Sequence, residues 1–88
     1  MMYEWDPSKA AANLAKHKVS FEVAEEFEWE SALVEEDRRY AYGERRFYAL
    51  GLVRGRAYAM IFTRRGPRVR IISFRKANDR ERRRYEHR

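Results

Sequence analysis

The sequence contains no cysteine, and it has only two prolines and four glycines among 88 residues. Without cysteine the protein can form neither a disulfide nor a thiolate metal site. No segment approaches the roughly 20 consecutive apolar residues of a membrane-spanning helix, and residues 1–6 lack the basic and apolar regions of a signal peptide. We therefore expect a soluble cytoplasmic protein that has no membrane partner. The chain length predicts a single domain over residues 1–88.

Positive charge is concentrated toward the C-terminal end. Residues 63–88 carry eleven Arg or Lys side chains and three acids, whereas residues 1–62 have a small excess of acids. Ten of these eleven cations are arginines, whose planar guanidinium binds phosphate oxygens in a bidentate manner. Residues 22–37, in contrast, contain eight acids and no base. Because a polarised field of this kind attracts polyanions, nucleic acid is the first partner to consider.

Two helices are predicted near the N-terminus, after a short strand over residues 3–5. Asp6 is placed to cap the first helix, and Pro7 takes its first helical position. Ser20 opens the second helix, in which apolar residues recur at three-residue intervals. These residues are Phe21, Ala24 and Phe27.

The remainder of the chain alternates in the manner of strands. The predicted strands cover residues 32–34, 45–53, 56–64 and 69–75, with turns at 38–43, 54–55 and 65–68. Asn78 then caps a final helix, and Glu81 completes a capping box. The order predicts an α+β fold, a compact single domain with an antiparallel four-stranded meander. A short N-terminal strand, two N-terminal helices and a C-terminal helix accompany the meander.

Several motifs resemble those of a known family. The segment from Trp5 to Ala24 reads W-D-x-x-K-x-x-x-N-x-x-K-H-x-x-x-F-x-x-A. The segment from Arg70 to Ala77 reads R-I-I-S-x-R-K-A, and E-R-x-x-Y ends at Tyr85. As a set these motifs closely resemble the BrnT toxins of bacterial type II toxin–antitoxin modules, and the similarity runs from Trp5 to Tyr85.

The resemblance implies a compact fold similar to that of RelE-type toxins, and it implies cleavage of RNA. It also implies neutralisation by an antitoxin with a ribbon-helix-helix DNA-binding domain, through which the complex contacts promoter DNA. Lys18 departs from the family pattern, which has glycine after the histidine. If the helix ends there in the left-handed conformation that suits glycine, Lys18 costs on the order of 1 kcal/mol.

RNA can be cleaved without a metal, because its 2′-hydroxyl can attack the adjacent phosphate. Arginine can stabilise the charge that develops on the phosphate, and His, Glu, Lys or Tyr can transfer the protons. The sequence has two histidines, His17 and His87, and neither has carboxylates at the spacing of metal ligands. We therefore expect a metal-independent endoribonuclease that has no cofactor.

Six residues are candidates for catalysis. Arg64 and Arg75 lie at ends of predicted strands that the meander could bring to one rim of the sheet. His17 has the side chain that titrates nearest neutrality. The resemblance adds Arg45, at the start of a predicted strand. The candidate catalytic residues are Arg64, Arg75, Arg45, His17, Glu22 and Tyr85, and the candidate RNA-binding residues are Lys76, Arg65, Arg70 and Arg82.

Two other classes of function fit the same residues. A nucleic-acid-binding module without catalytic activity would use the arginines to hold RNA or DNA. A toxin with the RelE fold could instead act on a protein such as DNA gyrase, because function depends on the site and not on the fold. Arginines accompanied by a histidine, a glutamate and a tyrosine favour RNA cleavage, since a gyrase poison needs no proton-transfer groups.

Overall fold

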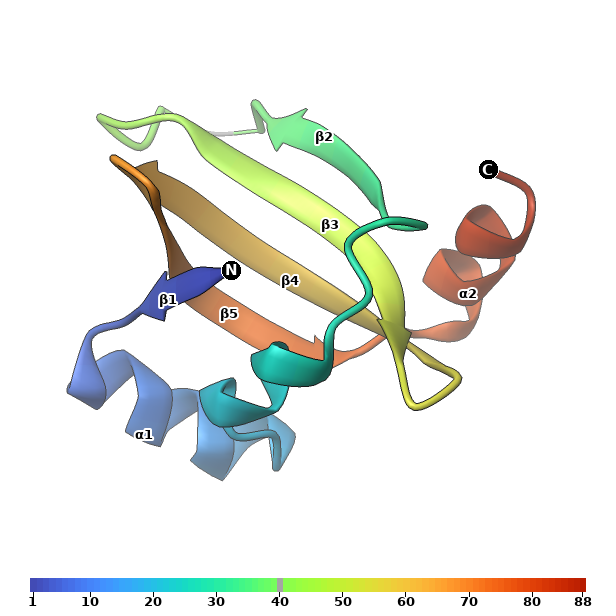
Figure 1. The fold of residues 1–88 in the computed structure, drawn as a ribbon, viewed down its shortest axis with the longest axis horizontal. Coiled ribbons are helices and arrows are strands. Elements are labelled where there is room, and N and C mark those ends of the chain that lie inside the picture. The colour runs from blue at the N-terminus through green and yellow to red at the C-terminus, as the bar shows by residue number, and fades with distance from the viewer. Residues whose placement is uncertain (40) are drawn as a thin grey trace.

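The computed structural model describes residues 1–39 and 41–88, and Figure 1 shows a curved sheet with helices at its periphery. The elements in chain order are β1 (Met2–Glu4), α1 (Pro7–His17), the 3₁₀ helix η1 (Phe21–Glu26), β2 (Leu33–Asp37), β3 (Arg46–Val53), β4 (Arg56–Arg65), β5 (Arg68–Lys76) and α2 (Asp79–Glu86). The turn predicted over residues 38–43 includes residue 40, which lies outside the described residues.

All five strands belong to one sheet, in the order β1-β5-β4-β3-β2. Strands β2 to β5 pair antiparallel, whereas β1 pairs parallel with β5, with Met2 opposite Arg68 and Glu4 opposite Arg70. Figure 1 shows β1 beside β5. The prediction of a four-stranded antiparallel sheet is therefore wrong. The N-terminal strand β1 belongs to the same sheet, which has five strands and one parallel pair.

The prediction of two N-terminal helices is also wrong. Asp6 and Pro7 begin α1 as expected, and the Asp6 side chain accepts a hydrogen bond from the Ser8 amide at 2.9 Å. The second segment forms only the short 3₁₀ helix η1. Its buried residues Phe21 and Ala24 are spaced by three, which matches the 3.0 residues per turn of a 3₁₀ helix rather than the 3.6 of an α-helix.

Strand β2 extends three residues beyond the end predicted at position 34. These residues are Glu35, Glu36 and Asp37, and acidic residues are normally depleted in strands. Pairing with β3 holds them in place, since Glu35 lies opposite Tyr48 and Asp37 lies opposite Arg46. The extension matters because it forms one wall of the functional cleft described below.

A bulge in β5 determines which side chains reach each face of the sheet. Ile61 of β4 lies opposite Ser73 and Phe62 lies opposite Ile71, so Ile72 is an extra residue on β5. A single extra residue reverses the alternation of the residues that follow it. Ile71 and Phe74 therefore both enter the main core, while Ser73 and Arg75 turn to the opposite face. This reversal explains why β5 carries apolar residues at both parities.

The two faces of the sheet are covered unequally. On one face, residues from α1 and η1 pack against the strands to form the main core. A close approach occurs at Gly51, where a Cβ atom would lie 2.5 Å from Cζ of Phe27, so only glycine leaves room for this ring. On the other face, Tyr85 of α2 packs with Leu50 and Ala59. Helix α2 covers only part of that face, and the remainder is open.

Asn13 fastens α1 to the sheet. Its side chain is buried, although Lys9 and Lys16, the nearest lysines of α1 on either side of it, are exposed. The Asn13 amide donates to the carbonyl oxygens of Phe74 at 2.7 Å and Val19 at 3.1 Å. The Phe74 amide donates back to Oδ1 of Asn13 at 3.1 Å. Asn13 thus provides hydrogen-bond partners for the backbone carbonyl and amide of Phe74, in the part of β5 that β1 does not reach.

The end of α1 leads to a stability prediction. Lys18 caps the helix with φ 62° and ψ 27°, the left-handed conformation, and its amide donates to the Leu14 carbonyl at 2.9 Å. We expect Lys18→Gly to raise the unfolding free energy by about 1 kcal/mol and the melting temperature by roughly 4–8 °C. Thermal denaturation measures this shift. The control Ala12→Gly, inside α1, should lower stability by about 1 kcal/mol, and a loss of stability in Lys18→Gly would contradict the strain argument.

Candidate functional site

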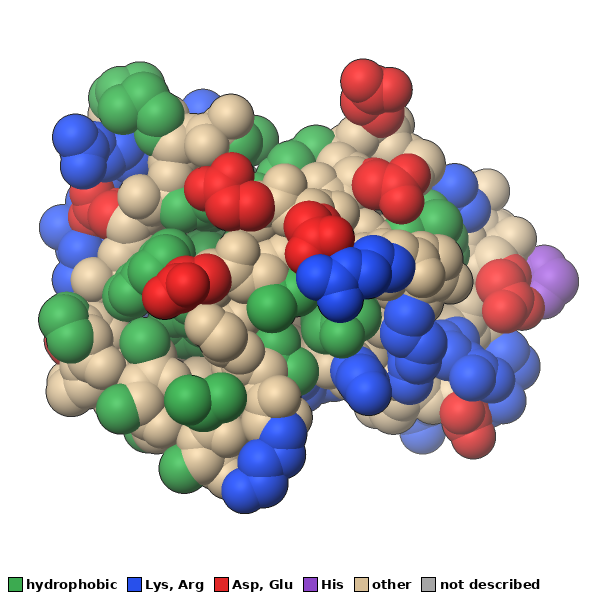
Figure 2. All heavy atoms as spheres, turned by 60° about the horizontal axis from the view of Figure 1, so that its bottom comes forward, with side chains coloured by type: hydrophobic (Ala, Val, Ile, Leu, Met, Phe, Trp, Pro, Cys, Tyr) green, Lys and Arg blue, Asp and Glu red, His purple; other side chains and the backbone are tan. Residues whose placement is uncertain are grey.

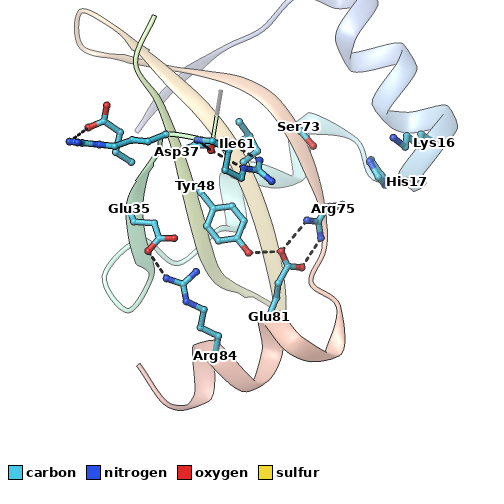
Figure 3. A pocket seen from close by; sticks show the side chains of 13 residues that line it. Lys16, His17, Glu35, Asp37, Tyr48, Ile61, Ser73, Arg75, Glu81 and Arg84 are labelled. Carbon is cyan, nitrogen blue, oxygen red and sulfur yellow. Dashed lines mark hydrogen bonds and ion pairs between the residues drawn. The ribbon is translucent and has the colours of Figure 1, made fainter. Parts of the chain in front are cut away.

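The open face of the sheet carries a cleft of about 500 Å³. Its floor is formed by β3, β4 and β5, and its walls come from β2, α2 and the end of α1 (Figure 3). The lining residues are Lys16, His17, Glu35, Glu36, Asp37, Arg38, Arg39, Tyr48, Ile61, Ser73, Arg75, Glu81 and Arg84. The cleft therefore combines arginines and acids with Lys16, His17 and Tyr48, whose side chains can also transfer protons.

Glu81 links three other residues of the protein at the cleft. It accepts hydrogen bonds from both terminal nitrogens of Arg75, at 2.7 and 3.0 Å, and from the Tyr48 hydroxyl. The Asn78 amide also donates to it at 2.9 Å, which completes the predicted capping box of α2. Burial alone would raise the pKa of Glu81, but the hydrogen bonds from Arg75, Tyr48 and Asn78 lower the pKa to about 2. This carboxylate is ionised at neutral pH and holds Arg75 in a fixed orientation.

Each of the other three acids in the cleft also bonds to arginine. Asp37, which is buried, accepts from Nε of Arg39 at 2.9 Å, and this hydrogen bond is the main reason that its pKa falls to about 2. The other pairs are Glu35 with Arg84 and Glu36 with both Arg38 and Arg45. Because the acids are neutralised in this way, the cleft does not repel an anion as strongly as its number of carboxylates suggests.

The end of α1 contributes Lys16 and His17. Figure 3 shows both side chains at the same side of the cleft as Arg75, with His17 the nearer of the two to Arg75. Within the described part of the chain, neither side chain makes a hydrogen bond or an ion pair. Burial lowers the pKa of His17 below its ordinary value of 6.5, and the positive charges of Lys16 and Arg75 lower it further. The imidazole is therefore mostly neutral at pH 7 and available to accept a proton.

The structure brings two of the predicted catalytic residues, His17 and Arg75, into the cleft. It places Arg64 elsewhere, because Arg64 lies opposite Val69 and Arg75 lies opposite Ala59. These pairs are separated by five residues of β4, or about 17 Å along the strand. The guanidinium groups of Arg64 and Arg75 therefore do not converge on one linkage.

The other three catalytic candidates also lie outside the cleft lining. Arg45 is exposed and bonds to Glu36, which places it beside the rim. Glu22 is exposed in the first turn of η1. Tyr85 is buried in the second core, and its hydroxyl donates to Oγ of Ser31 at 3.1 Å. The contacts of Tyr85 are those of a packing residue.

The predicted RNA-binding residues are distributed over three regions. Arg65 lies 3.7 Å from Glu44 near the end of β4, and Arg70 bonds to Glu4 of β1 at 2.7 Å. Arg82 lies on α2, and Lys76 ends β5 on the exposed surface. Figure 2 shows a dense group of Lys and Arg side chains at the end of the molecule that carries α2.

Sequence reasoning overlooked several residues of the cleft. Tyr48 reads as an ordinary strand residue, Glu81 as a helix cap, and Arg39 as part of a turn. The capping-box pattern could have indicated that Glu81 is fixed, but it could not show that the same carboxylate binds Arg75. Lys16 directly precedes His17 in the motif, and that position is the local signal that could have placed it in the cleft.

The low pKa of Glu81 predicts a pH-dependent contribution to stability. The pKa is about 2 in the folded protein against an ordinary 4.5, so the carboxylate stabilises the fold by about 3 kcal/mol above pH 4.5 and loses this contribution as the pH falls toward 2. Urea denaturation should therefore show that Glu81→Gln is less stable than wild type at pH 7 and nearly equal at pH 2. The control Glu86→Gln, exposed on the same helix, should change stability by less than about 0.5 kcal/mol. A deficit of equal size at both pH values would contradict the assigned ionisation.

Comparison with known proteins identifies the family. No helix among the described residues is long and apolar enough to cross a membrane, and no curated protein matches the chain. The family model described as the ribonuclease toxin BrnT of type II toxin–antitoxin systems matches residues 5–81. The match includes both ends of the cleft, from Lys16 and His17 to Glu81. The chain therefore belongs to the BrnT family, the ribonuclease toxins of type II toxin–antitoxin systems, which act on RNA and have an antitoxin protein as partner.

Proposed function

We propose that this toxin is a metal-independent endoribonuclease and that the cleft between α1, β5 and α2 is its active site. The observation that carries the proposal is the meeting of His17 and Lys16 with Arg75, which lies 58 residues after His17 in the sequence. A base, a flexible cation and a fixed guanidinium are together the groups that cleavage by the 2′-hydroxyl of RNA requires.

Arg75 and Lys16 bind the scissile phosphate in this proposal. Glu81 holds the guanidinium of Arg75 from one side, and about a third of the Arg75 side chain remains exposed toward the cleft (32%). A cation that is oriented before the substrate arrives stabilises developing negative charge with little reorganisation. The ammonium group of Lys16 is exposed and can approach the same phosphate from the α1 side.

His17 acts as the general base. Its neutral imidazole removes the proton from the 2′-hydroxyl, and the 2′ oxygen then forms a bond to phosphorus. The bond between phosphorus and the 5′ oxygen breaks, and Lys16 donates the proton that the leaving oxygen takes. The products are a 2′,3′-cyclic phosphate and a 5′-hydroxyl. Because the pKa of His17 is lowered, the base is in its active form at neutral pH.

The charge distribution of the cleft supports the absence of a metal from this mechanism. Glu36, Asp37 and Glu81 accept hydrogen bonds from arginine at both carboxylate oxygens, and Glu35 accepts one at Oε2. Among the described residues, no group of three or more His, Asp or Glu side chains is arranged to hold a metal ion. Guanidinium and ammonium groups supply the positive charge instead.

Cleavage of purified RNA in EDTA tests the proposal directly. We expect fragments that end in 2′,3′-cyclic phosphate, with a rate that falls as the pH drops through a value below 6.5. His17→Gln and Arg75→Gln should each reduce kcat/KM by about 10²–10⁴-fold. Arg64→Gln, at the far end of β4, is the control and should change it by less than about threefold.

Three results would contradict the proposal. Cleavage that EDTA abolishes would show a metal requirement. Equal losses in Arg64→Gln and Arg75→Gln would show that the cleft has no special role. Intact RNA combined with tight, salt-dependent binding would favour the nucleic-acid-binding module without catalysis.

We also propose that the partner antitoxin has a ribbon-helix-helix domain that binds promoter DNA. Residues 22–30 support a basic partner, because they carry exposed acids and, within the part of the chain that the structure describes, Glu26 alone among them bonds to an arginine, Arg54. Mixing toxin and antitoxin should abolish RNA cleavage, and the complex, but not the toxin alone, should retard promoter DNA in a gel. Unchanged cleavage in a tenfold excess of antitoxin would exclude neutralisation by direct binding.

A further inference from the structure

The cleft does not end at the tip of α1. A second hollow of about 220 Å³ lies between α1 and β5. We call it the α1–β5 groove, and its lining residues are Lys9, Ala12, Asn13, Lys16, His17, Ile72 and Ser73. Lys16, His17 and Ser73 also line the cleft, so the two hollows share a wall and form a continuous path.

The groove is positively charged along one side. Lys9 and Lys16 are seven residues apart on α1, which places them on the same face of the helix at a separation of roughly 10 Å along its axis. Both lysines are exposed, and across residues 1–39 and 41–88 neither ammonium group has a hydrogen-bond or ion-pair partner. The residues that line the groove include no carboxylate, in contrast to the cleft with its four. The groove therefore presents two cations whose charge is not compensated locally.

The walls of the groove are fixed before any ligand binds. Asn13 is fully used in hydrogen bonds to Phe74 and Val19, so its side chain anchors α1 to β5 and is not free to bind a ligand. Ile72, the extra residue of the β5 bulge, and Ala12 add apolar surface on either side. A rigid groove with cations along one wall loses little entropy when an extended polyanion enters it.

We propose that the α1–β5 groove binds the RNA strand next to the scissile linkage, and that Lys9 contacts the phosphate of a neighbouring nucleotide. This proposal rests on the proposed function, because it takes the cleft as the place where RNA is cut. Lys16 stands at the junction and reaches the scissile phosphate, while Lys9 lies two helical turns away and meets the next part of the backbone. The ligand is a single strand, since the groove offers one row of cations to one sugar–phosphate chain.

Binding of an oligonucleotide that cannot be cut tests the groove separately from catalysis. The probe is a fluorescein-labelled decamer of 2′-O-methyl RNA, and the readout is the dissociation constant by fluorescence anisotropy over a series of salt concentrations. Lys9→Gln should weaken binding by about three- to tenfold and reduce the slope of log K against log salt by about 0.7, the value for one phosphate contact on a single strand. Lys18→Gln is the matched control, because Lys18 is an exposed lysine at the end of α1 that lines neither hollow.

The outcomes separate the groove from the nuclease proposal. The groove proposal is wrong if Lys9→Gln and Lys18→Gln bind the probe with the same affinity and the same salt slope, even if the wild type cleaves RNA. A selective loss in Lys9→Gln would support RNA binding in the groove. If the wild type then cleaves nothing, the nuclease proposal fails, and with it the placement of a scissile linkage beside the groove. Circular dichroism of the variants checks that they fold, which the exposed position of Lys9 favours.

Discussion

The carboxylate of Glu81 is the interaction on which the cleft depends. It joins α2 to β5 through Arg75, joins α2 to β3 through Tyr48, and begins α2 through the Asn78 amide. A buried carboxylate is costly unless donors surround it, and here the donors come from β3, from β5 and from the start of α2. The same contacts that stabilise the anion therefore fix the position of the helix and the direction of the guanidinium.

A second set of hydrogen bonds, made by the side chain of Asn13, fixes the wall of the cleft that α1 forms. Asn13 binds the backbone of Phe74, one residue before Arg75, and holds the last turn of α1 against β5. The left-handed residue Lys18 ends the helix directly after His17. The imidazole is thus positioned by a buried amide on one side and a strained turn on the other. Strain of this kind is tolerated where the surrounding contacts over-determine the backbone.

The elements that the sequence predicted correctly are those formed by interactions between residues close together in the chain. The caps at Asp6 and Asn78, the hairpin at Arg54 and Gly55 with positive φ at both residues, and the alternation of β4 follow from neighbours in the chain. The sequence predictions failed where distant partners decide the outcome. Acidic residues 35–37 form a strand because they pair with β3 and bond to several arginines. Residues 21–26 form a 3₁₀ helix, in which the two buried side chains of Phe21 and Ala24 pack against the core.

The site was predictable to the same limited degree. His17 could be selected because its side chain titrates nearest neutrality, and Arg75 because it lies at the end of a predicted strand. No spacing rule places Tyr48 and Glu81 together, since 33 residues separate them. Arg64 seemed equivalent to Arg75 because each lies near the end of a strand. Strands β4 and β5 run antiparallel, however, so these two strand ends lie at opposite ends of the sheet along the strand direction.

The arrangement also has a consequence for the biosynthesis of a toxin. One wall of the cleft comes from residues 16–17, while Arg75, Glu81 and Arg84 come from a segment about 60 residues later in the sequence. A nascent chain whose last segment is still inside the ribosome has α1 but lacks Arg75 and Glu81, so it has no assembled cleft. The cleft can therefore form only after the segment that carries Arg75 and Glu81 has left the ribosome.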